Sequence, residues 1–320
     1  MGEIDIEEFD LATATEADQR ALFDLHVIWW KALPPRQLPE FSGWVQRMQV
    51  PDISWGLPRH VVAREDGLIV GYVDGYLPTA GNTHLVAGNV VVDPRCRGRG
   101  IGTALLRFAL PMANREVASA SWIPRGDEGW AVRRGFTVVS SLTIQWLVLT
   151  DPLPEVGEVP TGYRLVQWTG RAPDELLDAY VDALGAMNDQ PLDGSPINVV
   201  PYTRERARQE EDNLLAVGVE VWVVLALCGD EAAGVTVMHR TPSRPSAGQH
   251  RHTGVVAAHR GKGLGRLIKA HLLRQLTGIE IVETETSSEN EHMRRINHSL
   301  GYTDRLTVVD VSARVADLVL

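Results

Sequence analysis

The chain has 320 residues, of which 44% are hydrophobic and 22% are charged, as in an average globular protein. A single core stops growing at ~250–300 residues, so this length predicts two domains. Two cysteines, Cys96 and Cys228, exclude a disulfide framework and favour a reducing compartment. The net charge of −10 argues against nonspecific nucleic-acid binding and is compatible with a cationic amine as a partner.

The sequence carries no sign of export or of membrane insertion. Its first ten residues, MGEIDIEEFD, are acidic and lack the basic stretch and apolar run of a signal peptide. No apolar run reaches the ~18–20 residues that a membrane span needs. We therefore expect a cytoplasmic protein, a monomer or a homodimer, with neither nucleic acid nor membrane among its partners.

The first half, up to residue 150, is predicted to mix strands and helices. The Asp66-Gly67 pair is a hairpin signal between two of the strands. In chain order we expect a strand at 4–9, a helical segment near 15–33, strands at 59–63 and 68–76, a strand–loop–helix unit, and strands at 117–122 and 137–149.

The second half repeats this order after a linker. Residues 151–162 carry three prolines and two glycines without apolar periodicity, which is typical of a linker. The elements expected after it are a strand at 163–168, a helical segment near 173–187, strands at 220–227 and 233–239, a second strand–loop–helix unit, and strands at 280–285 and 306–311.

An internal repeat connects the two halves. Residues 90–106, VVVDPRCRGRGIGTALL, resemble residues 254–268, GVVAAHRGKGLGRLI, when Arg97 is aligned with Arg260, 163 positions later. This spacing is too long for a solenoid repeat and suits a duplicated domain. The repeat predicts one domain at 1–150 and another at 163–320.

Each copy of the repeat places Arg-x-x-Gly-x-Gly between a strand and a helix. Glycines let the backbone approach a ligand and adopt positive φ, and a helix N-terminus offers unpaired N–H groups to a phosphate. A tight turn without a ligand is the alternative, but two copies in one setting favour a binding loop. Neither copy has the Gly-Lys-Ser/Thr of a Walker loop or the third glycine of a dinucleotide fingerprint.

With these loops, the chain resembles the GNAT superfamily of N-acetyltransferases. A short helix is expected before Gly135-Phe136 and before Leu300-Gly301-Tyr302, and these helix endings fit the family as well. The resemblance covers nearly the whole chain, one domain per half. The tandem layout is similar to that of mycothiol synthase and other two-domain acetyltransferases. The resemblance implies an α/β (α+β) fold of two tandem GNAT domains, each with a mixed, mostly antiparallel central sheet and helices on both faces.

The resemblance also implies a site for acetyl-CoA as acyl donor. In the family, the loop binds the pyrophosphate, a strand amide polarises the acetyl carbonyl, and the fourth and fifth strands splay apart. In the first half the implied residues are Val91, Val92, Arg97, Gly98, Arg99, Gly100, Ile101, Gly102 and Thr103. In the second half they are Val255, Val256, Arg260, Gly261, Lys262, Gly263, Leu264, Gly265, Arg266 and Asn290, the last at the position of a pantetheine-facing asparagine.

The catalytic positions depart from the family pattern. Members often carry a glutamate as general base three residues before the matching valine, where this chain has Asn89 and His252. Members also often carry a tyrosine as general acid four residues before the glycine of Gly-Phe, where this chain has Ala131 and Asn297. Only histidine among these titrates near neutral pH, at ~6.5. We therefore expect a non-catalytic first half and a catalytic second half, with His252 as base and Asn297 in the site; a structural His252 and deprotonation through water are the alternatives.

Asp189 and Asp193 lie where the acceptor loop of the family falls, so they are candidates to hold an ammonium group or are part of a solvated loop. His250 and His252 alternate on one strand and are expected to share a face, but no third ligand is evident and no metal is expected. The function expected is acetyl transfer from acetyl-CoA to the primary amine of a small molecule by direct attack. The alternatives are a degenerate acetyl-CoA sensor, which the missing tyrosine favours, and a protein lysine acetyltransferase.

Overall fold

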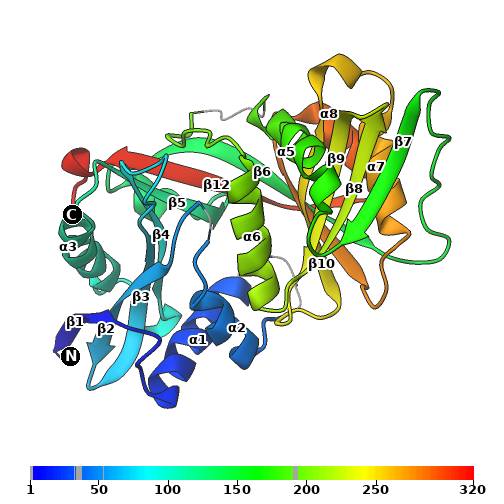
Figure 1. Ribbon diagram of the computed structural model, residues 1–320. Coiled ribbons are helices and arrows are strands. Elements are labelled where there is room, and N and C mark those ends of the chain that lie inside the picture. The colour runs from blue at the N-terminus through cyan, green and yellow to red at the C-terminus, as the bar shows by residue number, and fades with distance from the viewer. Residues whose placement is uncertain (1–2, 32, 34–37, 53, 190–193) are drawn as a thin grey trace. The chain divides into compact units, whose positions relative to one another are not determined.

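The computed structural model describes residues 3–31, 33, 38–52, 54–189 and 194–320 (Figure 1). They form two compact units. Unit 1 comprises Met1–Ser141, Leu192–Asn198 and Thr307–Leu320, and unit 2 comprises Leu142–Pro191 and Val199–Leu306.

The sheet of unit 1 is mixed and mostly antiparallel. Its strands follow the order β1-β2-β3-β4-β5-β12, in which only β4 and β5 are parallel neighbours. The bounds are β1 (Ile4–Phe9), β2 (Pro58–Glu65), β3 (Leu68–Tyr76), β4 (Leu85–Val92), β5 (Val117–Pro124) and β12 (Thr303–Arg314).

Helices cover both faces of this sheet. On one face, Tyr72 and Val91 pack with α1 (Glu16–Lys31) and α2 (Phe41–Met48). On the other face, Val73 packs with α3 (Ile101–Ala113), as the alternation of side chains along a strand requires. The short helix α4 (Gly129–Val132) precedes β6 (Thr137–Val148).

Helix α1 forms where the sequence has both an apolar stripe and a suitable first turn. Leu22 and Leu25 are three positions apart and are both buried. Glu16 and Asp18 in the first turn complement the positive end of the helix dipole. The burial of this stripe fixes the helical cover over β3 and β4.

Unit 2 repeats the arrangement. Its strand order is β6-β11-β10-β9-β8-β7, in which only β10 and β11 are parallel neighbours. The strands beside β6 are β7 (Tyr163–Thr169), β8 (Glu220–Cys228), β9 (Glu231–Arg240), β10 (Ala247–Val255) and β11 (Ile281–Ser287). The helices are α5 (Leu177–Leu184), α6 (Arg204–Ala216), α7 (Leu264–Leu273) and α8 (Glu291–Ser299).

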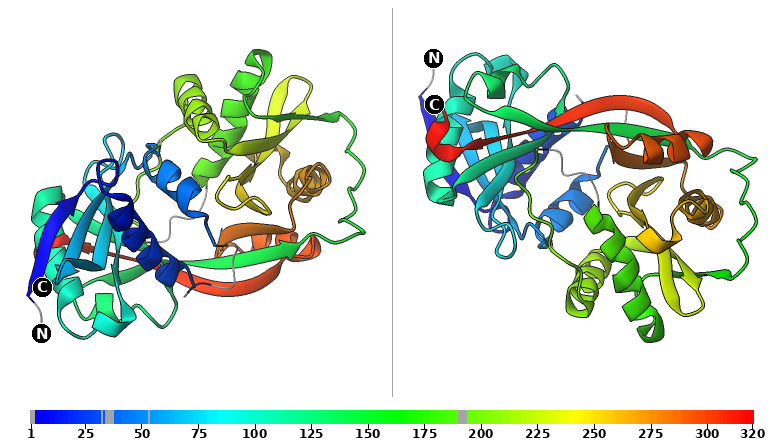
Figure 2. Two further views of the ribbon diagram at one scale, coloured as in Figure 1. Left: turned by 90° about the horizontal axis from the view of Figure 1, so that it is seen from below. Right: turned by 90° about the horizontal axis from the view of Figure 1, so that it is seen from above.

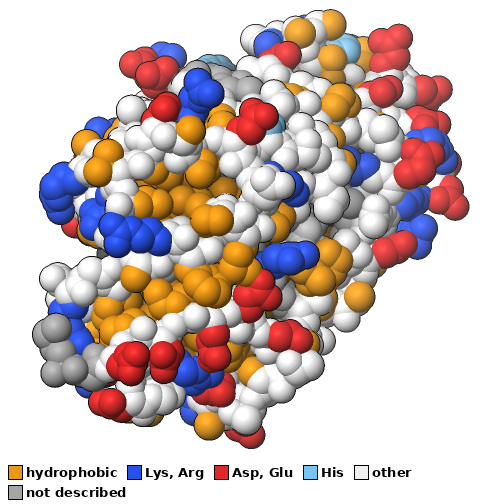
Figure 3. Space-filling model, turned by 90° about the vertical axis from the view of Figure 1, so that its left-hand side faces the viewer, with side chains coloured by type: hydrophobic (Ala, Val, Ile, Leu, Met, Phe, Trp, Pro, Cys, Tyr) orange, Lys and Arg blue, Asp and Glu red, His pale blue; other side chains and the backbone are white. Residues whose placement is uncertain are grey.

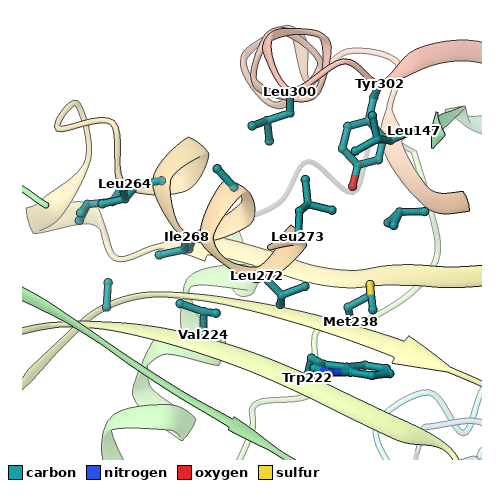
Figure 4. Close-up of a cluster of buried hydrophobic side chains, with 14 of the residues drawn as sticks. Leu147, Trp222, Val224, Met238, Leu264, Ile268, Leu272, Leu273, Leu300 and Tyr302 are labelled. Carbon is teal, nitrogen blue, oxygen red and sulfur yellow. The ribbon is translucent and has the colours of Figure 1, made fainter. Parts of the chain in front are cut away.

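Helix α7 is the centre of the unit 2 core. Its apolar side chains, Leu264, Ile268 and Leu272 among them, lie over Val224 and Met238 of β8 and β9 (Figure 4). Eight of its ten residues are buried, so this helix is fixed on its sheet over most of its circumference.

The closing strands of the two units come from unexpected places in the chain. In unit 1, β12 pairs with β5 from Val308 to Arg314, and the side chains of Val308, Val309 and Val311 are wholly buried (Figure 2). In unit 2, the first-half strand β6 pairs with β11 from Leu142 to Val148. Each half of the chain thus supplies the last strand of the other unit. The division at 1–150 and 163–320 stays a prediction about the two repeats, and the compact units differ from it by this exchange.

Most predicted elements are present within one to three residues, and the predicted fold class is confirmed in both units. Residues 151–162 contain neither helix nor strand. Two helices were not predicted, α2 and α6. Helix α6, RERARQEEDNLLA, is polar around most of its circumference, so it lacks the apolar stripe on which a sequence prediction depends. No helix among the described residues is long and apolar enough to cross a membrane.

We expect that deletion of residues 307–320 abolishes cooperative folding of unit 1, because it uncovers the edge of β5 and removes three fully buried valines. Calorimetry would show the loss of one unfolding transition. Val319→Ala is the control, since the Val319 side chain is 70% exposed and its backbone N–H bond to Arg134 is kept. An unchanged thermal profile in the longer deletion would contradict the role of β12.

Candidate active site

A gap opens between the two parallel strands of each sheet. In unit 1, β4 and β5 pair only from Leu85 to Ala87, yet β4 continues to Val92 and β5 to Pro124. In unit 2, the β10–β11 pairing ends at His250. The strands therefore splay in both units, as the resemblance implies.

The strand at the gap is irregular in a different way in each unit. In unit 1 the parallel pairing stops just before Gly88, where a Cβ would lie 1.8 Å from the carbonyl oxygen of Asp74, so only glycine fits. In unit 2 a β-bulge between His250 and His252 leaves Arg251 unpaired with β9. In both units the parallel pairing ends at or beside this position.

The gap leaves strand amides available to a ligand. Successive N–H groups of a strand point to opposite edges. The N–H of Asp93 donates to Val70 of β3 at 2.9 Å, so the N–H of Val92 points into the gap. By the same alternation, the bond from Val256 N–H to Ala233 at 3.0 Å directs the N–H of Val255 into the gap of unit 2.

The two glycine loops have the same backbone shape. Gly98 and Gly100 have φ of 77° and 83°, and Gly261 and Gly263 have φ of 77° and 76°. This left-handed region is one that side chains with a Cβ rarely adopt, and no atom lies within 4 Å of a Cβ added at these four positions. The glycines are therefore required by conformation and leave open space in front of the loop.

An arginine fastens each loop to its strand. Arg97 Nε donates to the carbonyl of Val92 at 3.1 Å, and Arg260 Nε donates to that of Val255 at 3.0 Å. Beyond the loops, α3 and α7 begin directly after Gly100 and Gly263, so their first N–H groups have no partner within the helix. Both loops therefore have the backbone arrangement that suits an anion at a helix N-terminus.

The helices are held close to the structure behind them by small residues. A Cβ at Gly102 would lie 3.0 Å from the Trp130 ring of α4, and one at Gly265 would lie 3.3 Å from Ile296 of α8. Asn290 accepts the N–H of Met293 at 3.0 Å and so caps α8. The cap gives Asn290 a structural role, and the expected contact with pantetheine stays a prediction.

Unit 1 contains a cavity of about 1660 Å³. Its lining includes Val90 and Val92 from the α3 face and Asn89 and Val91 from the α1 face, so the cavity reaches both sides of the gap. Of the first-half residues predicted to bind acetyl-CoA, all but Arg99 line it: Val91, Val92, Arg97, Gly98, Gly100, Ile101, Gly102 and Thr103. Arg99 instead forms an ion pair with Glu65. Viewed from the side of unit 1, hydrophobic side chains gather in a hollow with Lys and Arg along its edge (Figure 3).

His252 is half-buried in unit 2. Its Nε2 lies 3.4 Å from the hydroxyl of Tyr202, and burial, with the nearby charges of Arg251 and Arg206, lowers its pKa to about 3. The imidazole is therefore neutral at physiological pH and a weak proton acceptor.

The expectation that His250 and His252 share a face is wrong. They pair with the consecutive residues Met238 and Val237, so the bulge at Arg251 places their side chains on opposite faces. His250 Nδ1 lies 2.7 Å from the Tyr302 hydroxyl in the core. Within the described residues, no group of three or more His, Cys, Asp or Glu side chains is arranged to hold a metal ion.

Comparisons with known proteins agree with this geometry. The acetyltransferase (GNAT) family model matches residues 22–123. The chain is 30% identical over 265 residues to the mycothiol acetyltransferase of Nocardia farcinica, covering 77% of this chain and 80% of the relative. It is 31% identical over 259 residues to that of Thermomonospora curvata, covering 78% and 80%.

This chain belongs to the GNAT family of N-acetyltransferases. A tandem GNAT protein from the clavulanic acid biosynthesis pathway shares its fold, with a TM-score of 0.80 at 24% identity over 98% of each chain. A GCN5-related N-acetyltransferase from Sphaerobacter thermophilus has a TM-score of 0.73 at 18% identity, over 97% of this chain and 95% of that one. The protein is thus an acyltransferase built from tandem GNAT domains.

In this N-acetyltransferase, Asn297 lies inside the protein. It is 0% exposed, its Oδ1 accepts from Lys269 Nζ at 2.6 Å, and its Nδ2 donates to Gln145 at 2.7 Å and to Thr286 at 3.2 Å. A side chain with three buried partners has no free group for a substrate. The placement favours a structural role for Asn297 over the catalytic one expected.

The two candidate acceptor residues are not both described. Asp189 forms an exposed ion pair with Arg260 at 2.5 Å, beside the second glycine loop, while Asp193 lies outside the described residues. The adjoining Ala186 and Met187 would each lie 3.2 Å from a Cβ added at Gly254, so this segment covers the strand directly before Val255.

Sequence reasoning missed one acidic residue of the N-acetyltransferase, Asp74 of β3. Its Oδ1 accepts the N–H of Asn89 at 2.7 Å, at the position where the family often has a glutamate. The sequence signal that could have found it is a single acidic residue in an otherwise apolar and aromatic strand, LIVGYVDGY. A carboxylate in such a mostly buried strand is costly unless it is hydrogen-bonded or has a function.

We expect the His252 imidazole to stay neutral between about pH 5 and 8, because burial lowers its pKa to about 3. In NMR spectra of histidine-labelled protein its ring signals should not move in this range, and His252→Gln identifies them by their loss. A histidine in an unstructured peptide is the control and titrates at ~6.5. Titration of His252 near that value would contradict its lowered pKa and make it a candidate base of ordinary strength again.

Proposed function

We propose that this N-acetyltransferase transfers an acetyl group from acetyl-CoA to the primary amine of a small molecule, and that unit 1 binds the acetyl-CoA. The observation that carries the proposal is the unit 1 cavity, which connects the anion site at α3 to the gap beside Val92. The matched relatives are mycothiol acetyltransferases, and their name supports a small-molecule acceptor.

The residues of unit 1 divide the work of binding. The loop glycines and the first turn of α3 would bind the pyrophosphate through backbone N–H groups. The apolar walls of the gap would enclose the pantetheine arm. The N–H of Val92 would donate to the acetyl oxygen, where negative charge develops as the thioester is attacked.

The transfer step depends on groups that position the reactants and hold this charge. A neutral amine attacks the thioester carbon directly and the coenzyme A thiolate leaves. Fixing two reactants in attack geometry supplies a large part of such a rate enhancement. Withdrawal from water strengthens the hydrogen bond from Val92.

The prediction that transfer takes place in unit 2 stays a prediction. The two loops have the same shape, so the backbone of unit 2 also suits a pyrophosphate. The lowered pKa of His252 and the burial of Asn297 favour a second candidate for unit 2, the binding of acetyl-CoA without turnover. Variants of the two loops separate these assignments.

We expect Gly100→Val to weaken acetyl-CoA binding at least about tenfold, because a β-branched residue at φ 83° distorts the loop and projects toward the ligand. Calorimetry measures the affinity, and release of the coenzyme A thiol with a panel of amines measures turnover. Gly263→Val makes the same change in unit 2. Gly67→Val is the matched control, since Gly67 has φ 80° and equally open surroundings in the β2–β3 hairpin.

Two outcomes would contradict the assignment to unit 1. Turnover that survives Gly100→Val but not Gly263→Val would place transfer in unit 2. Unchanged acetyl-CoA affinity in the double variant would show that neither loop is the cofactor site.

A further inference from the structure

A row of three side chains crosses the α1 face of unit 1 where the gap begins. His60 of β2, Asp74 of β3 and Asn89 of β4 are direct neighbours in the strand pairing. Residues paired in this way place their side chains on one face of the sheet. His60 and Asn89 line the cavity, as do Val73 and Gly75 on either side of Asp74 along β3. Asp74 itself is half-buried at the margin of this lining and is not one of the lining residues.

Backbone amides hold the carboxylate of Asp74. Its Oδ1 accepts the N–H of Asn89 at 2.7 Å, and the N–H of Asp74 itself also bonds to the carboxylate. The residue is half-buried. Two oxygens offer about four lone-pair sites, so the carboxylate fixed beside the gap can still accept a hydrogen bond from a ligand.

No cation neutralises this carboxylate by an ion pair within the described residues. Its neighbours two positions away on β3 are Tyr72 and Tyr76. Tyr72 is bonded to His26 of α1 at 3.4 Å, and burial keeps the pKa of both tyrosines above their usual value. A carboxylate among neutral aromatic groups is suited to an ammonium ion, which gains both a charge partner and ring faces.

Asp74 lies beside the position at which a proton acceptor is missing. Asn89 stands where a base is expected on β4, but an amide takes no proton at neutral pH. Asp74 brings a carboxylate to the same row from the adjacent strand. We propose that Asp74 binds the ammonium group of the acceptor in unit 1 and takes its proton, which makes the acceptor a small cationic primary amine. This step rests on the proposed function.

The proposed step is balanced in atoms and charge. The acceptor arrives as R–NH3⁺ and gives one proton to the Asp74 carboxylate. The freed electron pair forms the C–N bond, the C–S bond breaks with its pair on sulfur, and the second proton passes from nitrogen to the thiolate. Asp74 then releases its proton to solvent, so the products are the amide, coenzyme A and H⁺.

The surroundings set the pH at which Asp74 acts. Burial raises the pKa of Asp74 to about 7, which suits a base that works near neutral pH. Burial lowers the pKa of His60 and His26 to about 4, so both rings stay uncharged there. The charged groups that act on this face from the helical side are Arg47 and Asp52, which influence Tyr76, and Asp10, which influences His60. The rate should therefore rise with pH through about 7 as Asp74 loses its proton.

Asp74→Asn is the decisive variant because its amide oxygen still accepts the Asn89 N–H. The probes are acetyl-CoA with a panel of small primary amines, and turnover is read as release of the coenzyme A thiol. We expect kcat to fall by ~10²–10⁴-fold and the pH limb near 7 to disappear. Asp74→Glu should restore part of the rate. Asp66→Asn, the same change in the β2–β3 turn, is the control and should leave the rate unchanged.

A second readout does not depend on turnover. A carboxyl whose pKa is raised on folding stabilises the fold below its unfolded pKa of ~4, and this contribution is lost as pH rises through about 7. Asp74→Asn removes the buried charge, so its melting temperature at about pH 8 should exceed that of the unchanged protein. If Asp74→Asn makes the protein more stable but slows the reaction, the charge of Asp74 serves function. If Asp74 were a structural residue, the substitution would make the protein less stable.

The outcomes distinguish this proposal from the one on which it rests. Tight acetyl-CoA binding abolished by Gly100→Val, with Asp74→Asn turnover within about threefold of the unchanged protein, would overturn Asp74 alone. The same would follow if a protein that binds acetyl-CoA in unit 1 released coenzyme A with no amine of the panel. Acetyl-CoA affinity insensitive to Gly100→Val would overturn the proposed function first.

Discussion

The early end of one parallel strand pair is the constraint on which this acetyltransferase depends. A buried backbone N–H without a partner costs free energy, so a sheet normally closes such gaps. Here β4 leaves β5 after Ala87, and the N–H of Val92 is withheld from the sheet. The glycine loop, the start of α3 and the cavity all lie at this opening. Each of them can contact a ligand only because the two strands separate here.

The two units have the same backbone fold but different side chains in the space beside the gap. Where unit 1 has Leu106, Ala131 and Phe136 in an apolar cluster, unit 2 has Lys269, Asn297 and Tyr302 at the aligned positions. Burial lowers the pKa of Lys269 to about 7, and its nitrogen is bonded to an amide rather than to a carboxylate. A polar network of this kind is stable only when its members are satisfied. The backbone of the GNAT fold thus persists in both units while the space beside the gap has diverged.

Features that depend on local chemistry were predictable from the sequence. Positive φ at Gly100 and Gly263, the Asp66-Gly67 hairpin and the repeat follow from residue types at short range. Features that depend on long-range pairing were not. The valines of β12 mark a buried strand, but no local signal assigns that strand to β5. The extra residue Arg251 inverted the face assigned to His252, because a shift of one residue exchanges the two faces of a strand.

The origin of β12 also orders the events of biosynthesis. A nascent chain usually folds its N-terminal domain first. Here the edge of β5 is covered by β12, which the ribosome makes only after all the strands from β6 to β11. Throughout that interval the apolar segment VASASWIP remains an open edge, which is a surface prone to pairing with other chains. The enzyme therefore reaches its finished N-terminal sheet late in translation, and we expect its nascent chain to rely on chaperones more than two independently closed domains would.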